Sequence, residues 1–297
     1  MKLLSNPSCT SGSKARGFSL LELCVASAVL LVVVGAAMNY VAVATQRSKV
    51  EQTKVDLSQE GREFVDEFER DIHQSGYPGC ANFNNFGVNN CATTTNYNKA
   101  NFAAGFISIS NTNVIFEGDV DGDGIVDSVQ YRLVDSVGNY PPSSTCPCTL
   151  QRSQVPKVAG LTAPTYTQAT NFSQELQNVV NSGVPGGTNT YGGGLPIAGN
   201  TLFAGANTTN TAYYAAITTF KDFPVFTAYD QNGLVVALPQ DNTTFAGQKT
   251  LATIKSIRLT INLLGSATTG YDTKTGVRPV LTLVGDARRN NRMAWEQ

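Results

Sequence analysis

The sequence predicts an α+β protein, in which one long N-terminal helix serves as membrane anchor and stalk and packs on an antiparallel β-sheet domain. Three observations predict this fold class. Residues 18–40 form an apolar run about as long as a bilayer-spanning helix. Residues 47–71 are rich in charge and carry apolar residues at helical spacing. Beyond residue 76, short stretches alternate apolar and polar residues between turns rich in Gly, Pro and Thr.

Composition limits the classes of function. The chain has 297 residues, 41% of them hydrophobic, which is enough for a sizeable core and one or two domains. Its formal net charge is -1, so no excess of Lys and Arg indicates a nucleic-acid surface, and we expect no nucleic-acid partner. Outside the charged segment the chain is rich in Asn, Thr, Gly and Ser, which is typical of an exported domain.

The N-terminal segment predicts a membrane anchor. The only charges before the apolar run are Lys2, Lys14 and Arg16, which by the positive-inside rule keep this end in the cytoplasm. A secretory signal peptide has a shorter apolar stretch, of roughly 7–15 residues, before a cleavage site of small residues. We expect three parts: residues 1–17, a long helix over 18–75 with its transmembrane part at 18–40, and a β-rich globular domain over 76–297, periplasmic or extracellular.

Glu22 is an acidic residue inside the apolar run. A carboxylate at the centre of a membrane helix costs roughly 2.5–3.5 kcal/mol, so a partner group is expected. One interpretation is that its side chain reaches the cytoplasmic headgroups. The other is that the chain is cut between Gly17 and Phe18, and that the new α-amine of one subunit lies beside Glu22 of its neighbour in a staggered assembly.

The stretch GFSLLELCVASAVLLVVVGAAMNY closely resembles the N-terminus of type IV prepilins. In that family a short basic leader ends in Gly, the first mature residue is Phe and mature position five is Glu, matching Gly17, Phe18 and Glu22. The resemblance implies that a prepilin peptidase cleaves off residues 1–17 as a leader and N-methylates Phe18, and that Glu22 sets the register between subunits. It also implies a single-pass inner-membrane protein that later joins a pilus on the cell surface.

Further stretches resemble PilW-like minor pilins. FERDIHQSGYPGC (68–80) resembles the end of their long helix, and FEGDVDGDGIVDSVQYRL and YDTKTGVRPVLTLVGDARRNN are similar to later parts. The resemblance implies a pilin-like fold, a minor pilin that primes or joins the filament, and other major and minor pilins as partners. A minor pseudopilin of type II secretion shares the same N-terminal chemistry, and a tip adhesin subunit is a further alternative.

The long helix is expected to be continuous. Leu57, Phe64, Phe68 and Ile72 lie on one helical stripe, with charged residues on the other faces. A helix from Phe18 to about Gln74 would end at the Gly and Pro residues of 76–79. The alternative is two helices joined near residues 40–46.

Downstream, the apolar periodicity changes from helical to two, which predicts strands. The clearest is IKSIRLTINLL, whose apolar residues alternate with Arg258, Thr260 and Asn262. One short helix is predicted at 172–180 (FSQELQNVV). Six further stretches are strand candidates: FISIS, NVIFEG, SVQYRLV, FPVFTAY, LVVALP and RPVLTLVG.

Four of the six cysteines follow the membrane segment, where an even set predicts two disulfides in an oxidising compartment. Sequence leaves three pairings open. A zinc site is the alternative, although the Cys-Pro-Cys spacing is tighter than zinc sites generally use. The other two lie in the leader and in the apolar run. In order, the cysteines are Cys9, Cys24, Cys80, Cys91, Cys146 and Cys148.

The stretch DVDGDGIVD (119–127) has the spacing of a calcium loop, with Gly124 at the sharp turn. It departs from an EF-hand because Gln130 stands where Glu is usual and the flanking segments read as strands. The alternative is a solvated Asp-Gly turn between two strands. Four carboxylates this close repel one another without a cation, which favours calcium. The predicted ligands are Asp119, Asp121, Asp123, the carbonyl of Ile125 and Asp127.

No catalytic constellation is visible in the sequence. The chain has one histidine, His73, which lies in the charged helical segment without a nearby nucleophile pattern. We therefore expect an assembly protein and not an enzyme.

Overall fold

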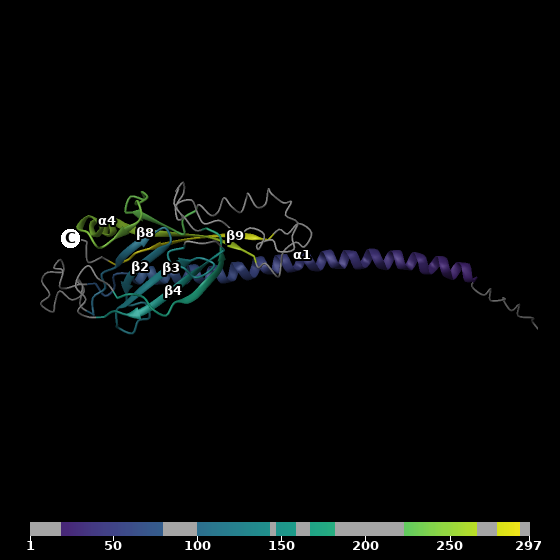
Figure 1. The fold of residues 1–297 in the computed structure, drawn as a ribbon, viewed down its shortest axis with the longest axis horizontal. Coiled ribbons are helices and arrows are strands. Elements are labelled where there is room, and N and C mark those ends of the chain that lie inside the picture. The colour runs from purple at the N-terminus through teal and green to yellow at the C-terminus, as the bar shows by residue number, and fades with distance from the viewer. Residues whose placement is uncertain are drawn as a thin grey trace, which may run out of the picture. The chain divides into compact units, whose positions relative to one another are not determined.

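The computed structural model describes residues 19–79, 100–142, 147–158, 167–181, 223–265 and 278–291. The chain divides into two compact units, Met1–Gln46 and Arg47–Gln297. Helix α1 (Leu20–Gln74) is unbroken through both, which confirms one continuous helix of 55 residues (Figure 1). The expected alternative of two helices joined near residues 40–46 is wrong.

The described part of the first unit is almost entirely the apolar part of α1. Its large hydrophobic side chains are exposed, for example Leu20 at 80% and Val32 at 73%. Among the described residues, α1 is the one helix that is long and apolar enough to cross a membrane. Exposed apolar surface of this extent is expected to be covered by lipid or by other protein chains.

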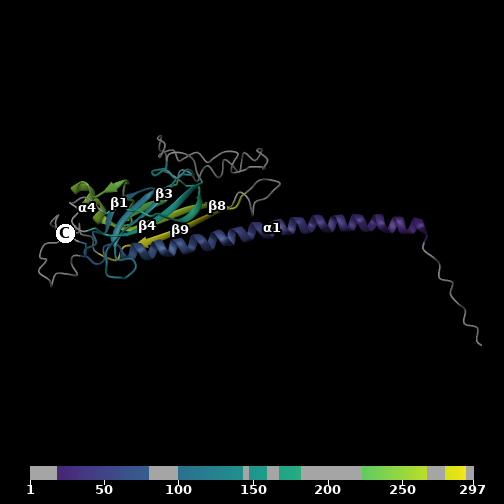
Figure 2. The same cartoon turned by 60° about the horizontal axis from the view of Figure 1, so that its bottom comes forward.

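The second unit holds the predicted antiparallel β-sheet, which curls around the end of α1 (Figure 2). In its described part the strand order is β6-β8-β5-β4-β3-β2-β1-β7, with β9 on the other edge of β8. The strands are β1 (Phe106–Ser110), β2 (Asn113–Gly118), β3 (Asp127–Val134), β4 (Cys148–Pro156), β5 (Ser173–Val179), β6 (Phe226–Asp230), β7 (Gln240–Asp241), β8 (Ile254–Leu264) and β9 (Val280–Arg288). A short helix, α4 (Phe245–Thr253), precedes β8.

The last turns of α1 pack on the sheet through one face. Leu57, Phe64, Phe68 and Ile72 are all buried, and burial of each such side chain contributes about 1.5–3 kcal/mol. The Phe68 ring meets the Tyr131 ring of β3 edge to face, with 5.2 Å between centroids. The predicted helical stripe is therefore the buried face of α1.

The end of α1 is fixed to the β2 strand by close backbone contact. Ser75 forms a bridge with Gly118, and the Gly76 N–H donates to the Glu117 carbonyl at 2.9 Å. A Cβ on Gly118 would lie 2.6 Å from the Gln74 carbonyl oxygen, so glycine is required there. This contact places the loop after β2 beside the end of the helix.

Two predictions about local structure are wrong. Residues 172–180 do not form a helix; Ser173–Val179 is strand β5, paired with β4. The buried apolar residues of β5 are Leu176 and Val179, and their separation of three residues resembles helical spacing. The segment is nevertheless a strand, because it pairs with β4. Residues 234–239 form only a bridge at Val235, opposite Tyr229.

Candidate functional site

The aspartate-rich loop connects β2 to β3 as an antiparallel hairpin, as predicted. Asp119 is buried at its start, while Asp121 and Asp123 are exposed. One carboxylate oxygen of each lies within 4.8 Å of the others. This acidic cluster could hold a metal ion, because oxygen ligands that converge at this separation suit a hard divalent cation.

The loop backbone holds Asp119 in place. Gly122 and Gly124 have φ values of 77° and 83°, which glycine adopts without strain. Their N–H groups donate to Asp119 Oδ1 at 2.9 Å and to Oδ2 at 3.1 Å. The Asp123 N–H donates to Asp121, and the Ile125 N–H donates to Asp123. These bonds explain why the carboxylates converge.

Asp127, the first residue of β3, is buried beside this cluster. Its carboxylate accepts a 2.8 Å hydrogen bond from Gln154 Nε2, and the same nitrogen donates to Asp121 at 3.1 Å. Burial, and then repulsion from Asp121, raise the pKa of Asp127 to about 6, against the lowering effect of the Gln154 bond. Asp127 is thus linked to the cluster through a side chain of another strand.

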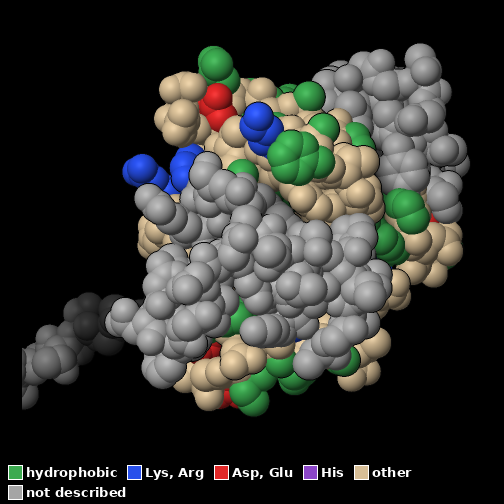
Figure 3. Space-filling model, turned by 90° about the vertical axis from the view of Figure 1, so that its left-hand side faces the viewer, with side chains coloured by type: hydrophobic (Ala, Val, Ile, Leu, Met, Phe, Trp, Pro, Cys, Tyr) green, Lys and Arg blue, Asp and Glu red, His purple; other side chains and the backbone are tan. Residues whose placement is uncertain are grey.

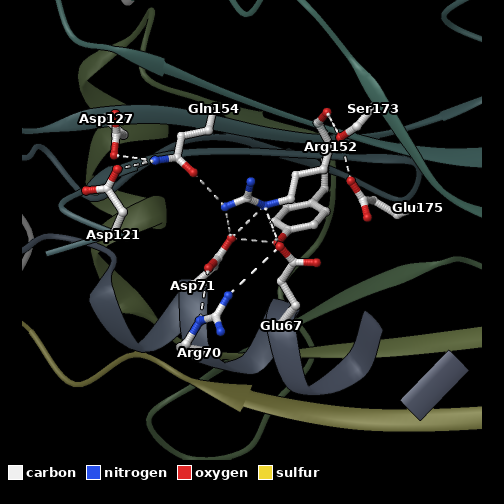
Figure 4. A network of polar contacts seen from close by, with 10 residues as sticks. Glu67, Arg70, Asp71, Asp121, Asp127, Arg152, Gln154, Ser173 and Glu175 are labelled. Atoms are coloured by element: carbon white, nitrogen blue, oxygen red, sulfur yellow. Dashed lines mark hydrogen bonds and ion pairs between the residues drawn. The ribbon is translucent and has the colours of Figure 1, made fainter. Parts of the chain in front are cut away.

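A buried ion pair continues this network into α1 (Figure 4). Arg152 of β4 donates to Asp71 Oδ2 from Nη2 at 2.7 Å and from Nε at 2.9 Å. The Tyr131 hydroxyl donates to the same oxygen at 2.7 Å. Arg152 Nη2 also donates to Gln154 Oε1 at 3.0 Å, so polar contacts run without a break from Asp71 to the loop.

The charged groups around Arg152 shift one another's pKa values. Burial lowers its pKa, but Tyr131 and Asp71 raise it by more, so the guanidinium stays charged. Burial raises the pKa of Glu67, whose carboxylate lies 3.4 Å from Arg152. The arrangement is therefore a buried charge cluster in which Arg152 and Tyr131 both bind the Asp71 carboxylate.

A second buried ion pair supports the start of the loop. Lys157 Nζ lies 2.6 Å from Glu117 Oε2 and also donates to the Phe102 carbonyl at 2.8 Å. The Ala104 N–H donates to the same carboxylate at 2.9 Å. Burial raises the pKa of Glu117, while the charge of Lys157 lowers it. With its hydrogen bonds made, this pair has a structural role in joining β2 to the segment before β1.

The remaining predicted site residues are scattered over the chain. Glu22 lies in the first turn of α1, and Cys24 is an exposed free thiol on the same helix. Cys148 is fully buried in β4, whereas the Ile125 side chain is exposed. The role of the Ile125 backbone carbonyl as a ligand stays a prediction. The disulfides also stay a prediction. Five of the predicted site residues lie outside the described part of the chain: Gly17, Phe18, Cys80, Cys91 and Cys146.

Sequence reasoning missed Asp71, Arg152 and Gln154. Asp71 and Arg152 are 81 residues apart, and Gln154 is 33 residues from Asp121, so no local spacing connects them. One signal was available, since Arg152 and Gln154 are two apart and would share a face of a strand.

In the described part of the globular domain, exposed hydrophobic side chains do not gather into one patch. Among the described residues of this domain, the most exposed large hydrophobic side chains are Phe245, Val137, Val235 and Leu234. Figure 3 shows one face of the domain, on which hydrophobic side chains lie scattered among polar and charged ones. Scattered exposure of this kind is usual for a soluble surface.

Comparisons of the chain with protein-family models, characterised proteins and solved structures found no match.

Proposed function

We propose that this chain is a minor pilin of a type IV pilus, a structural subunit that primes or joins the filament. The observation that supports it most is the combination of a prepilin-like N-terminus with a continuous α1. The apolar residues of α1 are exposed in its first unit, whereas residues 57–72 bury a stripe against the sheet. An assembly subunit needs this division between a surface for other subunits and a surface for its own domain.

In this proposal the apolar part of α1 anchors the protein in the inner membrane and then packs with other major and minor pilins. Glu22 is exposed in the first turn of α1, as a side chain that pairs between subunits must be. Its partner is the α-amine of Phe18 on a neighbouring subunit, released by prepilin peptidase. The globular domain faces the periplasm and then the outside of the cell, and the chain has no enzymatic role.

The proposal includes a structural calcium ion in the β2–β3 loop. Asp119, Asp121 and Asp123 would supply carboxylate oxygens, with Asp127 and the carbonyl of Ile125 completing the set. The convergence of the three carboxylates within 4.8 Å supports this assignment, because their mutual repulsion falls when a cation neutralises them. A charged Asp-Gly turn without an ion is the alternative.

The first prediction concerns processing. Mass spectrometry of the protein from membranes is expected to show a chain that begins at a methylated Phe18, because the peptidase cleaves after Gly17. The variant Gly17→Ala is expected to retain residues 1–17. A mature N-terminus after Ala28 or Ala37 would contradict the prepilin assignment, since cleavage there belongs to a secretory signal.

The second prediction concerns Glu22. Glu22→Val is expected to be cleaved and inserted normally, because transfer of an apolar Val side chain into hydrocarbon is more favourable than transfer of the Glu carboxylate. Its incorporation into filaments is expected to fall strongly, since the intersubunit pair is lost. Glu51→Val, an exposed position in the charged part of α1, is the control. Unchanged piliation and unchanged recovery of partner pilins would contradict the pairing, and loss of type II secretion with normal pili would favour the pseudopilin alternative.

A further inference from the structure

We propose that Gln154 competes with the cation for Asp127 and thereby sets the cation affinity of the β2–β3 loop. This inference rests on the calcium site proposed above and concerns how that site is regulated. Gln154 comes from β4, outside the loop, and its Nε2 lies 3.1 Å from Asp121 Oδ2 and 2.8 Å from Asp127 Oδ2 (Figure 4). A donor group from another strand is thus already bound by two of the carboxylates.

The amide nitrogen is a substitute for a cation and cannot be its ligand. Its N–H groups carry partial positive charge and donate to both carboxylates, which offsets part of their repulsion in the cation-free loop. Each carboxylate oxygen has two lone pairs, and a cation that takes the lone pairs of Asp121 and Asp127 that accept these bonds displaces this nitrogen. Gln154 therefore stabilises the cation-free state and weakens binding by the same free energy.

Arg152 fixes the orientation of this amide. Its Nη2 donates to Gln154 Oε1 at 3.0 Å, and a guanidinium has only donors, so a turned amide would place N–H groups against it. Arg152 is itself held by two bonds to Asp71, whose side chain is 1% exposed. The one atom of Gln154 able to coordinate a cation is thus kept directed away from the loop by a residue anchored to α1.

The test is calorimetric titration of calcium chloride into the full mature chain in detergent at pH 7. For Gln154→Ala we expect the Kd for calcium to fall about tenfold, the size expected when one hydrogen bond to a charged acceptor no longer has to be broken. The melting temperature in chelator is expected to fall, because the cation-free loop loses a stabilising contact. If Gln154→Ala does not fold, Gln154→Met keeps a similar length without an N–H donor or an amide oxygen, and the same fall in Kd is expected.

Gln151→Ala is the matched control. Gln151 is on the same strand and also accepts from an arginine, Arg132 Nε at 3.0 Å, but its position is on the other side of β4. The Kd of Gln151→Ala for calcium is expected to equal that of the wild type. If the wild type binds calcium and Gln154→Ala binds it no more tightly, the proposed competition by Gln154 is refuted, whereas the calcium site in the β2–β3 loop is supported. If the wild type binds no calcium at millimolar concentration, the calcium site is itself refuted, and the inference with it.

Discussion

Replacing Arg152 by alanine is expected to lower the free energy of unfolding by about 3–5 kcal/mol, because the buried Asp71 carboxylate then loses the cation that is hydrogen-bonded to it and keeps only the exposed Arg70, 3.8 Å away. Arg152 makes two hydrogen bonds to Asp71 Oδ2, and the two side chains are 13% and 1% exposed. The loss corresponds to a fall in melting temperature of roughly 6–20 °C for a domain of this size. Circular dichroism melting of the full mature chain in detergent measures it.

Arg258→Ala is the control for this prediction. Arg258 also makes two hydrogen bonds to one aspartate, at 2.8 and 3.1 Å to Asp286, but the two side chains are 44% and 54% exposed. An exposed pair contributes only about 0–1 kcal/mol, so this variant is expected to melt close to the wild type. Equal effects of the two substitutions would show that Asp71 does not depend on Arg152 for its stability in the core.

The parts of the fold that the sequence predicts are those with one strong local period. Strand β8 alternates buried and more exposed residues from Ile257 to Ile261, and β2 and β3 form the hairpin around a loop of aspartates and glycines. Helix α1 is long and keeps one apolar stripe. In each of these elements the local pattern agrees with the tertiary packing, which is why sequence reasoning succeeds.

Strand β4 was not predicted from the sequence because the residues that connect it to α1 and to the β2–β3 loop are polar. Arg152 and Gln154 face the network to α1 and the loop, so the strand lacks the apolar alternation that marks a half-buried face. Helix α4 was missed because it is only nine residues long, with Leu251 as its one buried large side chain. The loop carboxylates were found from spacing, whereas Asp71 and Arg152 meet only through the folded sheet.

In the absence of calcium, the globular domain is expected to lose stability as the pH rises from about 4 to 6, and Asp127 is expected to cause a defined part of the loss. Burial and the nearby aspartates raise the pKa of Asp127 to about 6 from its usual 3.8. Between these values the folded state holds a proton that the unfolded state has released, so the stabilisation present at low pH is lost as Asp127 ionises. Solvent screening by the exposed loop limits this part to about 1–2 kcal/mol.

Melting curves of wild type and Asp127→Asn in chelator, recorded from pH 4 to 7, isolate the contribution of this carboxyl from those of other buried acids. The free energy of unfolding of Asp127→Asn minus that of the wild type is expected to increase by about 1–2 kcal/mol as the pH rises. Asp66→Asn, at an exposed position on α1, is expected to follow the wild type. Saturating calcium should reverse the trend, because the ion binds the ionised carboxylate and competes with the proton. A calcium affinity that stays constant from pH 5 to 7 would place Asp127 outside the coordination shell.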